Sequence, residues 1–319
     1  MSQKKVYVAL QKFCETDDRP RKVLREAGFQ VEENRWGRRL RREEMPELLR
    51  EADAILAGVE PYDAKLLEAL PKLQCISRCG VGTDSIDEVA ARRLGVAILN
   101  TPEEVVEPVA ELTVAMILAL ARHLPLHVAD FQEGLWKKRT GFLLSEWTVG
   151  LVGFGRIGQA VECLLRPFGP RILVSDPRLE GQGLPETVTP CPLDTLLSQA
   201  DCISLHLSRP AQEGPLIGPK ELASMKRGSY LVNTARGFLV DEAALQEALL
   251  CGHLAGAALD VFETEPYSGP LASLPQVLCT PHIATLTRAS RCAMELSSAQ
   301  NVVQFFLETN TAATVGRKA

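Results

Sequence analysis

The sequence predicts an α/β protein with two domains, each built on a doubly wound parallel β-sheet. The chain has 319 residues, which is more than one ordinary core requires and enough for two domains. Short β-rich runs alternate with helical patterns almost from end to end, which is typical of βαβ units. Hydrophobic residues make up 46% of the chain and charged residues 24%, so the composition is that of a folded, soluble protein.

The first hundred residues predict one compact α/β domain, because β-rich runs there are separated by helical patterns. These runs occupy residues 6–10, 54–57, 75–78 and 97–99. A long helix predicted over about residues 107–131 then marks a domain boundary. Its apolar face requires burial against another domain or a second copy of the chain, so we expect a homodimer. The residues that define this face are Leu112, Ala115, Met116 and Ala119.

Further β-rich runs predict a complete doubly wound sheet in the second domain. They lie at residues 148–152, 171–175, 202–205, 230–233, 255–259 and 277–279. A last helix over about residues 288–307 could return to the first domain. We therefore predict that a domain of residues 100–284 is inserted into a domain made of residues 1–99 and 285–319.

Charge and apolar patterning exclude several classes of protein. The net charge is −5, and the arginine-rich segment 35–42 is followed at once by Glu43 and Glu44, so no nucleic-acid surface is expected. The longest apolar run, residues 112–121, is far shorter than the roughly 20 residues of a membrane span. The first strand follows without a signal-peptide pattern, and the nine cysteines include no C-x-x-C pair. We expect a cytoplasmic protein without a disulfide framework.

A glycine-rich motif predicts where a dinucleotide binds. Gly153, Gly155 and Gly158 form G-x-G-x-x-G directly after the strand at 148–152 and at the head of a helix. Such glycines let the backbone turn tightly and approach a pyrophosphate, which binds at the positive end of the helix. Arg156, inside the motif, could add charge against the pyrophosphate or form an exposed salt bridge.

Asp176 predicts which dinucleotide is bound. It follows the next strand, where a carboxylate can accept hydrogen bonds from both hydroxyls of the adenine ribose, although it could also serve a turn before Pro177. Arg178 could meet the 2′-phosphate of NADP, but Asp176 would repel that phosphate. NAD is therefore the expected cofactor. The second domain is then a Rossmann cofactor domain, inserted into a flavodoxin-like substrate domain.

Three polar segments follow strands of this second sheet and are expected to converge on one ligand crevice. They supply Arg236, Glu265 and His282. Reduction of a 2-oxo acid needs a cation for the substrate carboxylate, a proton donor for the carbonyl oxygen, and a partner that keeps this donor protonated. Arg236, His282 and Glu265 fit these roles in that order.

With these motifs in this order, the chain resembles the D-isomer-specific 2-hydroxyacid dehydrogenase family, and within it the phosphoglycerate dehydrogenase-like branch, over nearly its whole length. The resemblance rests on residues 80–84, 152–158, 233–237, 259–266 and 280–282. It implies an NAD-dependent oxidoreductase that moves a hydride between nicotinamide and a small D-2-hydroxy or 2-oxo acid.

The resemblance also implies roles for individual residues. Arg236 would grip the substrate, His282 would act as the acid and base with Glu265 as its partner, and Asp260 would face the nicotinamide carboxamide. The loop at 78–82 would close on the substrate from the first domain. The predicted cofactor-binding residues are Gly153, Gly155, Arg156, Ile157, Gly158, Asp176, Thr234 and Asp260. The predicted substrate-binding residues are Arg78, Val81, Gly82 and Arg236.

Departures from the family pattern leave the substrate open. Val105 stands where many relatives have an asparagine, Pro108 replaces a common small polar residue, and residues 207–212 lack the usual proline and threonine pattern. Arg78 could hold a phosphate as a bidentate pair. The second arginine expected for 3-phosphoglycerate is missing, because that region holds Ala57, Gly58 and Glu60.

Two further alternatives concern histidines and the class of protein. His206 could lie near the cofactor or be a structural histidine. His123 and His127 have helical spacing, but Pro125 interrupts them and no carboxylate completes a site, so we expect no metal. A non-catalytic, NAD(H)-responsive binding protein like the corepressors of the family is the alternative function. A formate dehydrogenase would need a different set of polar residues.

Overall fold

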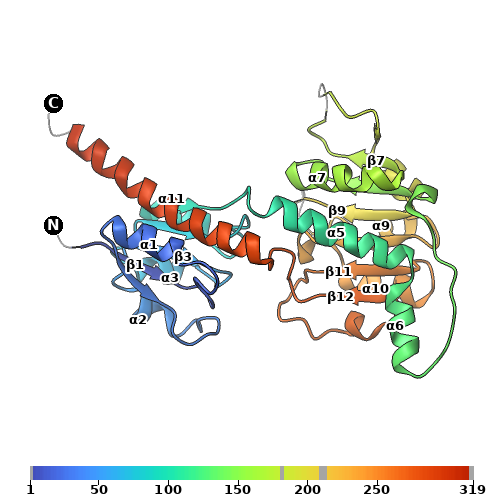
Figure 1. Cartoon of the computed structure of the whole chain (residues 1–319), viewed down its shortest axis with the longest axis horizontal. Coiled ribbons are helices and arrows are strands. Elements are labelled where there is room, and N and C mark those ends of the chain that lie inside the picture. The colour runs from blue at the N-terminus through green and yellow to red at the C-terminus, as the bar shows by residue number, and fades with distance from the viewer. Residues whose placement is uncertain (1–2, 180–182, 208–213, 316–319) are drawn as a thin grey trace. The chain divides into compact units, whose positions relative to one another are not determined.

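The computed structural model describes residues 3–179, 183–207 and 214–315 and divides into two compact units, each with one parallel sheet (Figure 1). Unit 1 is Met1–Val105 with Leu286–Ala319, and unit 2 is Val106–Thr285. The predicted α/β class with two parallel-sheet domains is confirmed.

Unit 1 contains five strands in the order β2-β1-β3-β4-β5, all parallel. The strands are β1 (Lys5–Val8), β2 (Gln30–Glu33), β3 (Ala54–Ala57), β4 (Cys75–Arg78) and β5 (Ala97–Leu99). The helices are α1 (Arg19–Glu26), α2 (Met45–Leu49), α3 (Ala64–Glu68), α4 (Glu88–Leu94) and α11 (Arg288–Val315). This strand order has its switch point between β1 and β3, where open α/β sheets bind ligands.

The central strands β1, β3 and β4 are buried on both faces, because successive strand side chains point to opposite faces and most of them are apolar or small. Tyr7, Ile55 and Ile76 pack into a core with residues of α2, α3 and α4. On the other face α11 lies against β4 beside α1 (Figure 1). There the Ser298 hydroxyl is 3.0 Å from that of Ser77. The last helix thus returns to the first unit.

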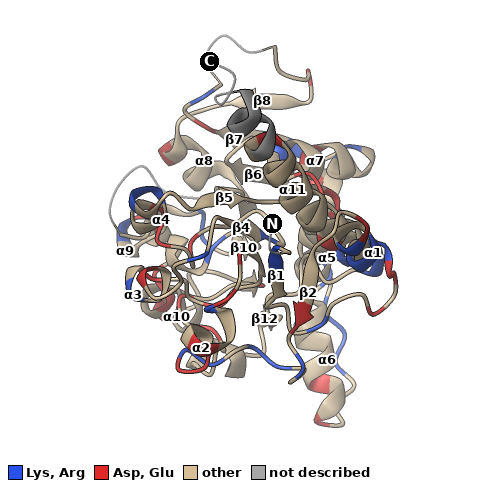
Figure 2. Cartoon of the chain, turned by 90° about the vertical axis from the view of Figure 1, so that its left-hand side faces the viewer, with Lys and Arg blue, Asp and Glu red and all other residues tan. Residues whose placement is uncertain are grey.

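Strand β2 was not predicted from the sequence. Its residues Gln30–Glu33 include two glutamates and form the edge of the sheet, where charged side chains are common and hydropathy gives no signal. Charges of both signs are interspersed over the elements of this unit (Figure 2). In the arginine-rich segment, Arg38 forms an ion pair with Glu44, with 2.6 Å between Nη2 and Oε1.

Unit 2 contains seven parallel strands in the order β12-β11-β10-β9-β6-β7-β8. The strands are β6 (Thr148–Val152), β7 (Arg171–Ser175), β8 (Val188–Pro190), β9 (Cys202–Leu205), β10 (Tyr230–Asn233), β11 (Gly256–Leu259) and β12 (Val277–Cys279). The helices are α5 (Val106–Ala121), α6 (Leu124–Gln132), α7 (Arg156–Leu165), α8 (Leu193–Gln199), α9 (Pro219–Ser224) and α10 (Glu242–Leu250). Short 3₁₀ turns are η1 (Leu144–Glu146), η2 (Arg166–Phe168), η3 (Gly237–Leu239) and η4 (Pro270–Ser273).

The chain order of unit 2 reverses between β6 and β9, so the carboxyl ends of these two strands form the switch point. Strand β8 was missed by the sequence prediction. It is a three-residue edge strand that ends in Pro190, and proline is tolerated only at such edges.

The predicted single helix over residues 107–131 is wrong, because the structure has two helices there, bent by 65°. Helix α5 ends at Ala121 and α6 begins at Leu124. His123 lies between them with a left-handed φ of 51°. Pro125 explains the break, since proline lacks an N–H group and its ring clashes with the carbonyl four residues earlier in a continuous helix.

Two further findings concern cysteines and helix length. All nine cysteines are free thiols. Within the described residues no single helix combines the length and apolarity of a membrane span, and only the bent pair α5 and α6 meets that criterion jointly.

Candidate active site

The glycine motif forms the turn between β6 and α7. Gly153 has a φ of +95°, and a Cβ atom there would lie 2.8 Å from the carbonyl oxygen of His206. A Cβ atom at Gly158 would overlap the Gly153 carbonyl oxygen. At Gly155 a Cβ atom would meet only Arg178 Nη2, at 3.7 Å, so this side of the turn is open. The turn therefore has the shape that a pyrophosphate requires at a helix N-terminus.

The first residues of α7 complete this cradle. Arg156 is exposed at the helix start, and Ile157 is half-buried behind it. No side chain among the described residues caps the helix at Gly155. The N–H groups of a helix's first turn have no partner within the helix, and together with the positive end of the helix they suit a bound anion.

Asp176 follows β7 and is held by the glycine turn and by Arg178. Its Oδ2 atom accepts a hydrogen bond from the Phe154 N–H at 2.8 Å, and its Oδ1 atom accepts one from the Arg178 N–H at 2.9 Å. Arg178 Nη2 lies 3.0 Å from Oδ2. Burial raises the pKa of Asp176, but these hydrogen bonds outweigh burial and hold the pKa at about 2. The predicted ribose acceptor is thus a fixed anion, and it also clamps the glycine turn.

His206 follows β9, on the other side of the switch point from the glycine motif. Neither ring nitrogen has a hydrogen-bond partner among the described residues, and both nitrogens are buried. Burial lowers the pKa of His206 to about 4, so the ring is neutral at pH 7. Both alternatives from the sequence, a contact with the cofactor and a structural role, therefore stay open. The unpartnered nitrogens of His206 beside the glycine turn suit a polar ligand.

His282 and Glu265 form the pair that the sequence predicts as acid–base and partner. The Nδ1 atom of His282 lies 2.9 Å from Oε2 and 3.1 Å from Oε1 of Glu265. His282 follows β12 and has a left-handed φ of 54°. Its side chain is 41% exposed, so the ring can reach solvent or a ligand while Nδ1 stays bound to the carboxylate.

Asp260 fixes the turn that carries His282. Its side chain is fully buried, and its Oδ1 atom accepts hydrogen bonds from the Thr280 hydroxyl at 2.6 Å and the Ile283 N–H at 2.8 Å. Its Oδ2 atom accepts one from the Ala284 N–H at 2.9 Å. The sequence predicted a contact from Asp260 to the cofactor and missed this positioning role. The available signal in the sequence was an aspartate placed directly after an apolar strand.

Arg236 is positioned by a turn after β10. The Asn233 side chain closes this turn, because its Nδ2 donates to the Arg236 carbonyl oxygen at 2.8 Å and its Oδ1 accepts from the Ala235 N–H at 3.1 Å. A Cβ atom at Gly237 would overlap the backbone of Phe262, so only glycine allows the β10 and β11 turns to meet. These contacts bring the Arg236 turn beside the segment that leads to Glu265.

Thr234, predicted to bind the cofactor, is buried and lies against α5. Its hydroxyl is 2.7 Å from the hydroxyl of Thr113, which lies 2.7 Å from the Val109 carbonyl oxygen. Since the Thr113 hydrogen goes to that carbonyl, Thr234 donates to Thr113. The hydroxyl of Thr234 thus ties the β10 turn to helix α5.

The predicted substrate residues of unit 1 lie in and after β4. Arg78 ends the strand, and the following loop carries Val81, which is 37% exposed, and Gly82. The Gly80 N–H donates to the Thr101 hydroxyl at 2.8 Å, and the Asn100 side chain donates to the Val81 carbonyl oxygen at 2.9 Å. The β5 end therefore anchors this loop.

Other predicted features are distributed as follows. Val105 is buried at the end of unit 1, and Pro108 lies in the first turn of α5. Residues 208–212 of the atypical stretch after His206 lie outside the described residues. Within the described residues, no group of three His, Cys, Asp or Glu side chains could hold a metal ion. His123 instead places Nδ1 3.4 Å from the Tyr230 hydroxyl.

Comparison with known proteins identifies the relatives of this chain. Residues 114–284 match the family described as D-isomer specific 2-hydroxyacid dehydrogenase, NAD binding domain. The D-3-phosphoglycerate dehydrogenase of Mycobacterium bovis is 40% identical over 265 residues, which are 82% of this chain and 50% of that protein. This chain thus spans about half the length of the mycobacterial relatives that it matches.

A second relative matches over most of both chains. The hydroxypyruvate reductase of Thermotoga maritima is 38% identical over 255 residues, which are 78% of this chain and 83% of that protein. The crystal structure of the TT0316 protein from Thermus thermophilus superposes with a TM-score of 0.82 at 35% identity and covers 93% of this chain and 95% of that one. The family match assigns NAD as the cofactor, and the open glycine turn of unit 2 fits its pyrophosphate.

Proposed function

We propose that this chain, which belongs to the D-isomer specific 2-hydroxyacid dehydrogenase family, is an NAD-dependent oxidoreductase that interconverts a small D-2-hydroxy acid and its 2-oxo acid. The observation that carries the proposal is the His282–Glu265 pair, with 2.9 Å between Nδ1 and Oε2. Strand β12, which His282 follows, belongs to the same sheet as strand β6, which the glycine motif follows.

In this proposal each group in the unit 2 site has one task. NAD, when bound, exchanges a hydride with C2 of the substrate. His282 gives a proton from Nε2 to the carbonyl oxygen during reduction and takes it back during oxidation. Glu265 accepts a hydrogen bond from Nδ1 and so fixes the orientation of the ring. Arg236 binds the substrate carboxylate.

Cofactor and substrate residues are assigned to different units. Unit 2 holds NAD through the glycine motif, Asp176 and the open start of α7, with His206 as an additional polar contact. Unit 1 contributes Arg78, Val81 and Gly82 to substrate binding.

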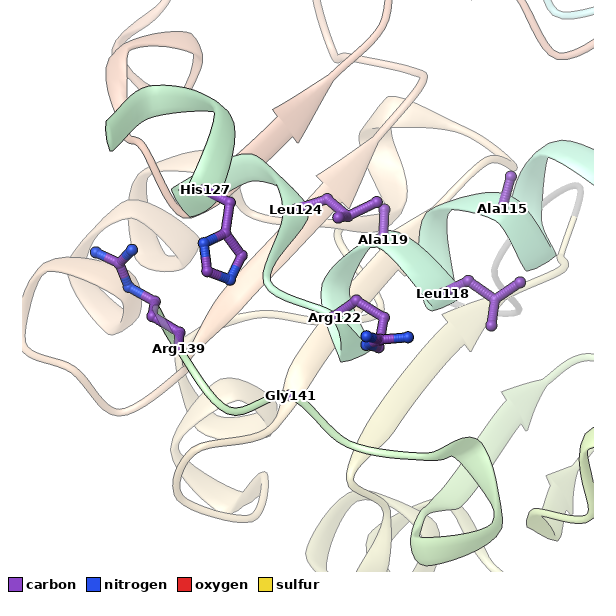
Figure 3. Close-up of a pocket in the computed structure, with 8 residues that line it drawn as sticks. All are labelled: Ala115, Leu118, Ala119, Arg122, Leu124, His127, Arg139 and Gly141. Atoms are coloured by element: carbon purple, nitrogen blue, oxygen red, sulfur yellow. The ribbon is translucent and has the colours of Figure 1, made fainter. Parts of the chain in front are cut away.

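A second copy of the chain is the proposed partner. Helix α6 and the segment after it expose large apolar side chains, namely Leu124, Val128, Phe131, Trp136 and Leu143. Beside them a hollow of about 520 Å³ opens between α5, α6 and the segment at 139–141 (Figure 3). Of the predicted apolar face, Met116 is buried in the core of unit 2, whereas Ala115 and Ala119 line this hollow.

We expect a homodimer in sedimentation at micromolar concentration, because several large apolar side chains on one helix and the segment after it are rarely left open to water. Trp136→Glu, which places a charge on the most exposed of these side chains, should shift the chain toward monomer. A wild-type monomer at that concentration would contradict the dimer. We further assign the protein to the cytoplasm, where nine unpaired thiols remain reduced.

The test of the activity is turnover. Purified protein is mixed with NADH and a panel of 2-oxo acids that includes pyruvate, glyoxylate, hydroxypyruvate and 3-phosphohydroxypyruvate, and NADH absorbance is followed. We expect oxidation of NADH with at least one of them. Rates within background across the whole panel would refute the proposal and favour a protein that binds NAD(H) without catalysis.

A further inference from the structure

A buried carboxyl group lies at the carboxyl edge of the unit 1 sheet, beside the switch point between β1 and β3. Glu60 follows β3 and is 2% exposed. Its Oε2 atom has no hydrogen-bond partner among the described residues, and neither has the buried hydroxyl of Tyr62. Leaving a buried carboxyl oxygen without a partner is costly, so this group calls for a functional explanation.

Arg78 lies on the neighbouring strand at the same edge. The register pairs Ala57, which ends β3, with Arg78, which ends β4. Burial raises the pKa of Glu60, and the charges of Arg39 and Arg78 act in the opposite direction. Burial outweighs these charges and the backbone hydrogen bonds to the carboxylate, so the pKa of Glu60 is raised, but two guanidinium groups, one of them that of the predicted substrate residue Arg78, oppose this effect.

Two glycines leave the space that these charged side chains occupy. A Cβ atom at Gly58 would lie 2.7 Å from Glu60 Oε2, and a Cβ atom at Gly80 would lie 2.6 Å from Arg78 Nη1. Each glycine comes shortly after its strand, so the backbone itself is shaped around the carboxylate and the guanidinium. Each glycine thus leaves room for one charged side chain at this edge.

We propose that Glu60 is a positioning residue for substrate specificity, which balances the charge of Arg78 so that unit 1 takes a neutral hydroxyl group at C3 of the substrate and rejects a phosphate there. This inference rests on the proposed function and names the substrate class of that site, a 3-hydroxy-2-oxo acid. Arg78 can donate a hydrogen bond to the oxygen of a neutral hydroxyl group, which adds no charge to the site. A phosphate dianion would instead be repelled by the buried carboxylate of Glu60.

The experiment compares hydroxypyruvate with 3-phosphohydroxypyruvate, which differ only in the group on C3. We expect the wild type to prefer hydroxypyruvate, measured as kcat/KM with NADH at about pH 8, where a phosphate monoester is a dianion. Glu60→Gln should raise the kcat/KM ratio of the phosphorylated to the hydroxylated substrate by at least about tenfold, because one like charge is removed. Glu60→Asp, which keeps the charge, should leave the ratio near that of the wild type.

Glu43→Gln is the matched control. It removes the same charge from an exposed position of unit 1, and its ratio should equal that of the wild type. Circular dichroism checks that the Glu60 variants are folded. If Glu60→Gln fails to fold, Gly58→Ala, which displaces the Glu60 carboxylate, should change the ratio in the same direction.

A second readout does not depend on turnover. Calorimetric titration of D-glycerate and 3-phospho-D-glycerate into protein with NADH measures the same discrimination as a ratio of Kd values. A ratio that is unchanged within twofold in both Glu60→Gln and Gly58→Ala would overturn the inference, as would a wild type that prefers the phosphorylated ligand. If no substrate is turned over but Glu60→Gln changes the ratio of Kd values, the proposed function is refuted and the role of Glu60 in discrimination is retained.

Discussion

The carboxyl edges of the two sheets differ in how their buried charges are satisfied. In unit 2, the carboxylates of Asp176 and Asp260 accept hydrogen bonds on both oxygens, and Glu265 binds His282. In unit 1, Glu60 retains a buried oxygen without a partner among the described residues. Fully bonded carboxylates hold a fixed geometry, which suits proton transfer. In our proposal the incompletely bonded carboxylate of Glu60 balances the charge of Arg78, and this suits discrimination between substrates of different charge.

The comparison predicts that variants in unit 2 affect all substrates alike, and His282→Ala should give the largest effect. Loss of the acid–base should lower kcat by roughly 100 to 10,000-fold, because a positioned proton donor typically contributes that much. The loss should be equal for glyoxylate and hydroxypyruvate. NADH affinity, measured by fluorescence titration, should stay within about twofold. A loss restricted to one substrate would place His282 in recognition instead of proton transfer.

Arg78→Ala in unit 1 should give a smaller effect that depends on the substrate. Removing a hydrogen bond from a charged donor should reduce kcat/KM for hydroxypyruvate by about 1.5 to 3 kcal/mol. Glyoxylate, which has no C3 group, should be nearly unaffected. Steady-state kinetics on both substrates measure the difference. Equal losses would mean that Arg78 shapes the loop before Val81 and does not contact the C3 substituent.

Asp176→Asn should give the smallest effect, on stability as a function of pH. The folded pKa of Asp176 is about 2, below its ordinary value of 3.8. Its ionised form therefore stabilises the folded state above pH 3.8, by about 2 kcal/mol at most. This contribution is lost as the pH falls toward 2.

Urea unfolding at several pH values tests the sign. Asp176→Asn should be less stable than the wild type near pH 7, and the gap should close as the solution is acidified toward pH 2. Glu60→Gln should behave in the opposite sense, because burial raises the pKa of Glu60, so ionisation at higher pH opposes folding. If both variants changed the free energy of unfolding in the same way with pH, the distinction between the carboxyl edges of the two sheets would be refuted.

Much of this molecule could be predicted from its sequence, because the signals are local. Strands such as Thr148–Val152 and Cys202–Leu205 are short apolar runs bounded by glycine or polar residues, and their length and composition favour strands. The glycine motif depends on the positive φ of Gly153 and on the close backbone approach at Gly158, both of which favour glycine. The edge strands β2 and β8 were missed, because short or charged edge strands leave no periodic signal. The break at His123 was missed although Pro125 marks it in the sequence.

The sequence by itself determined the two parallel sheets, the cofactor motif and which residue types stand at the strand ends. Only the tertiary structure decided which of these residues form hydrogen bonds with each other. Asp260 binds the turn after β12, and Asp176 pairs with Arg178 while clamping the glycine turn. The burial of Glu60 was likewise decided by the tertiary structure. Hydrogen-bond partners and burial depend on residues that are distant in the chain, and a local pattern carries no record of which of them folding brings together.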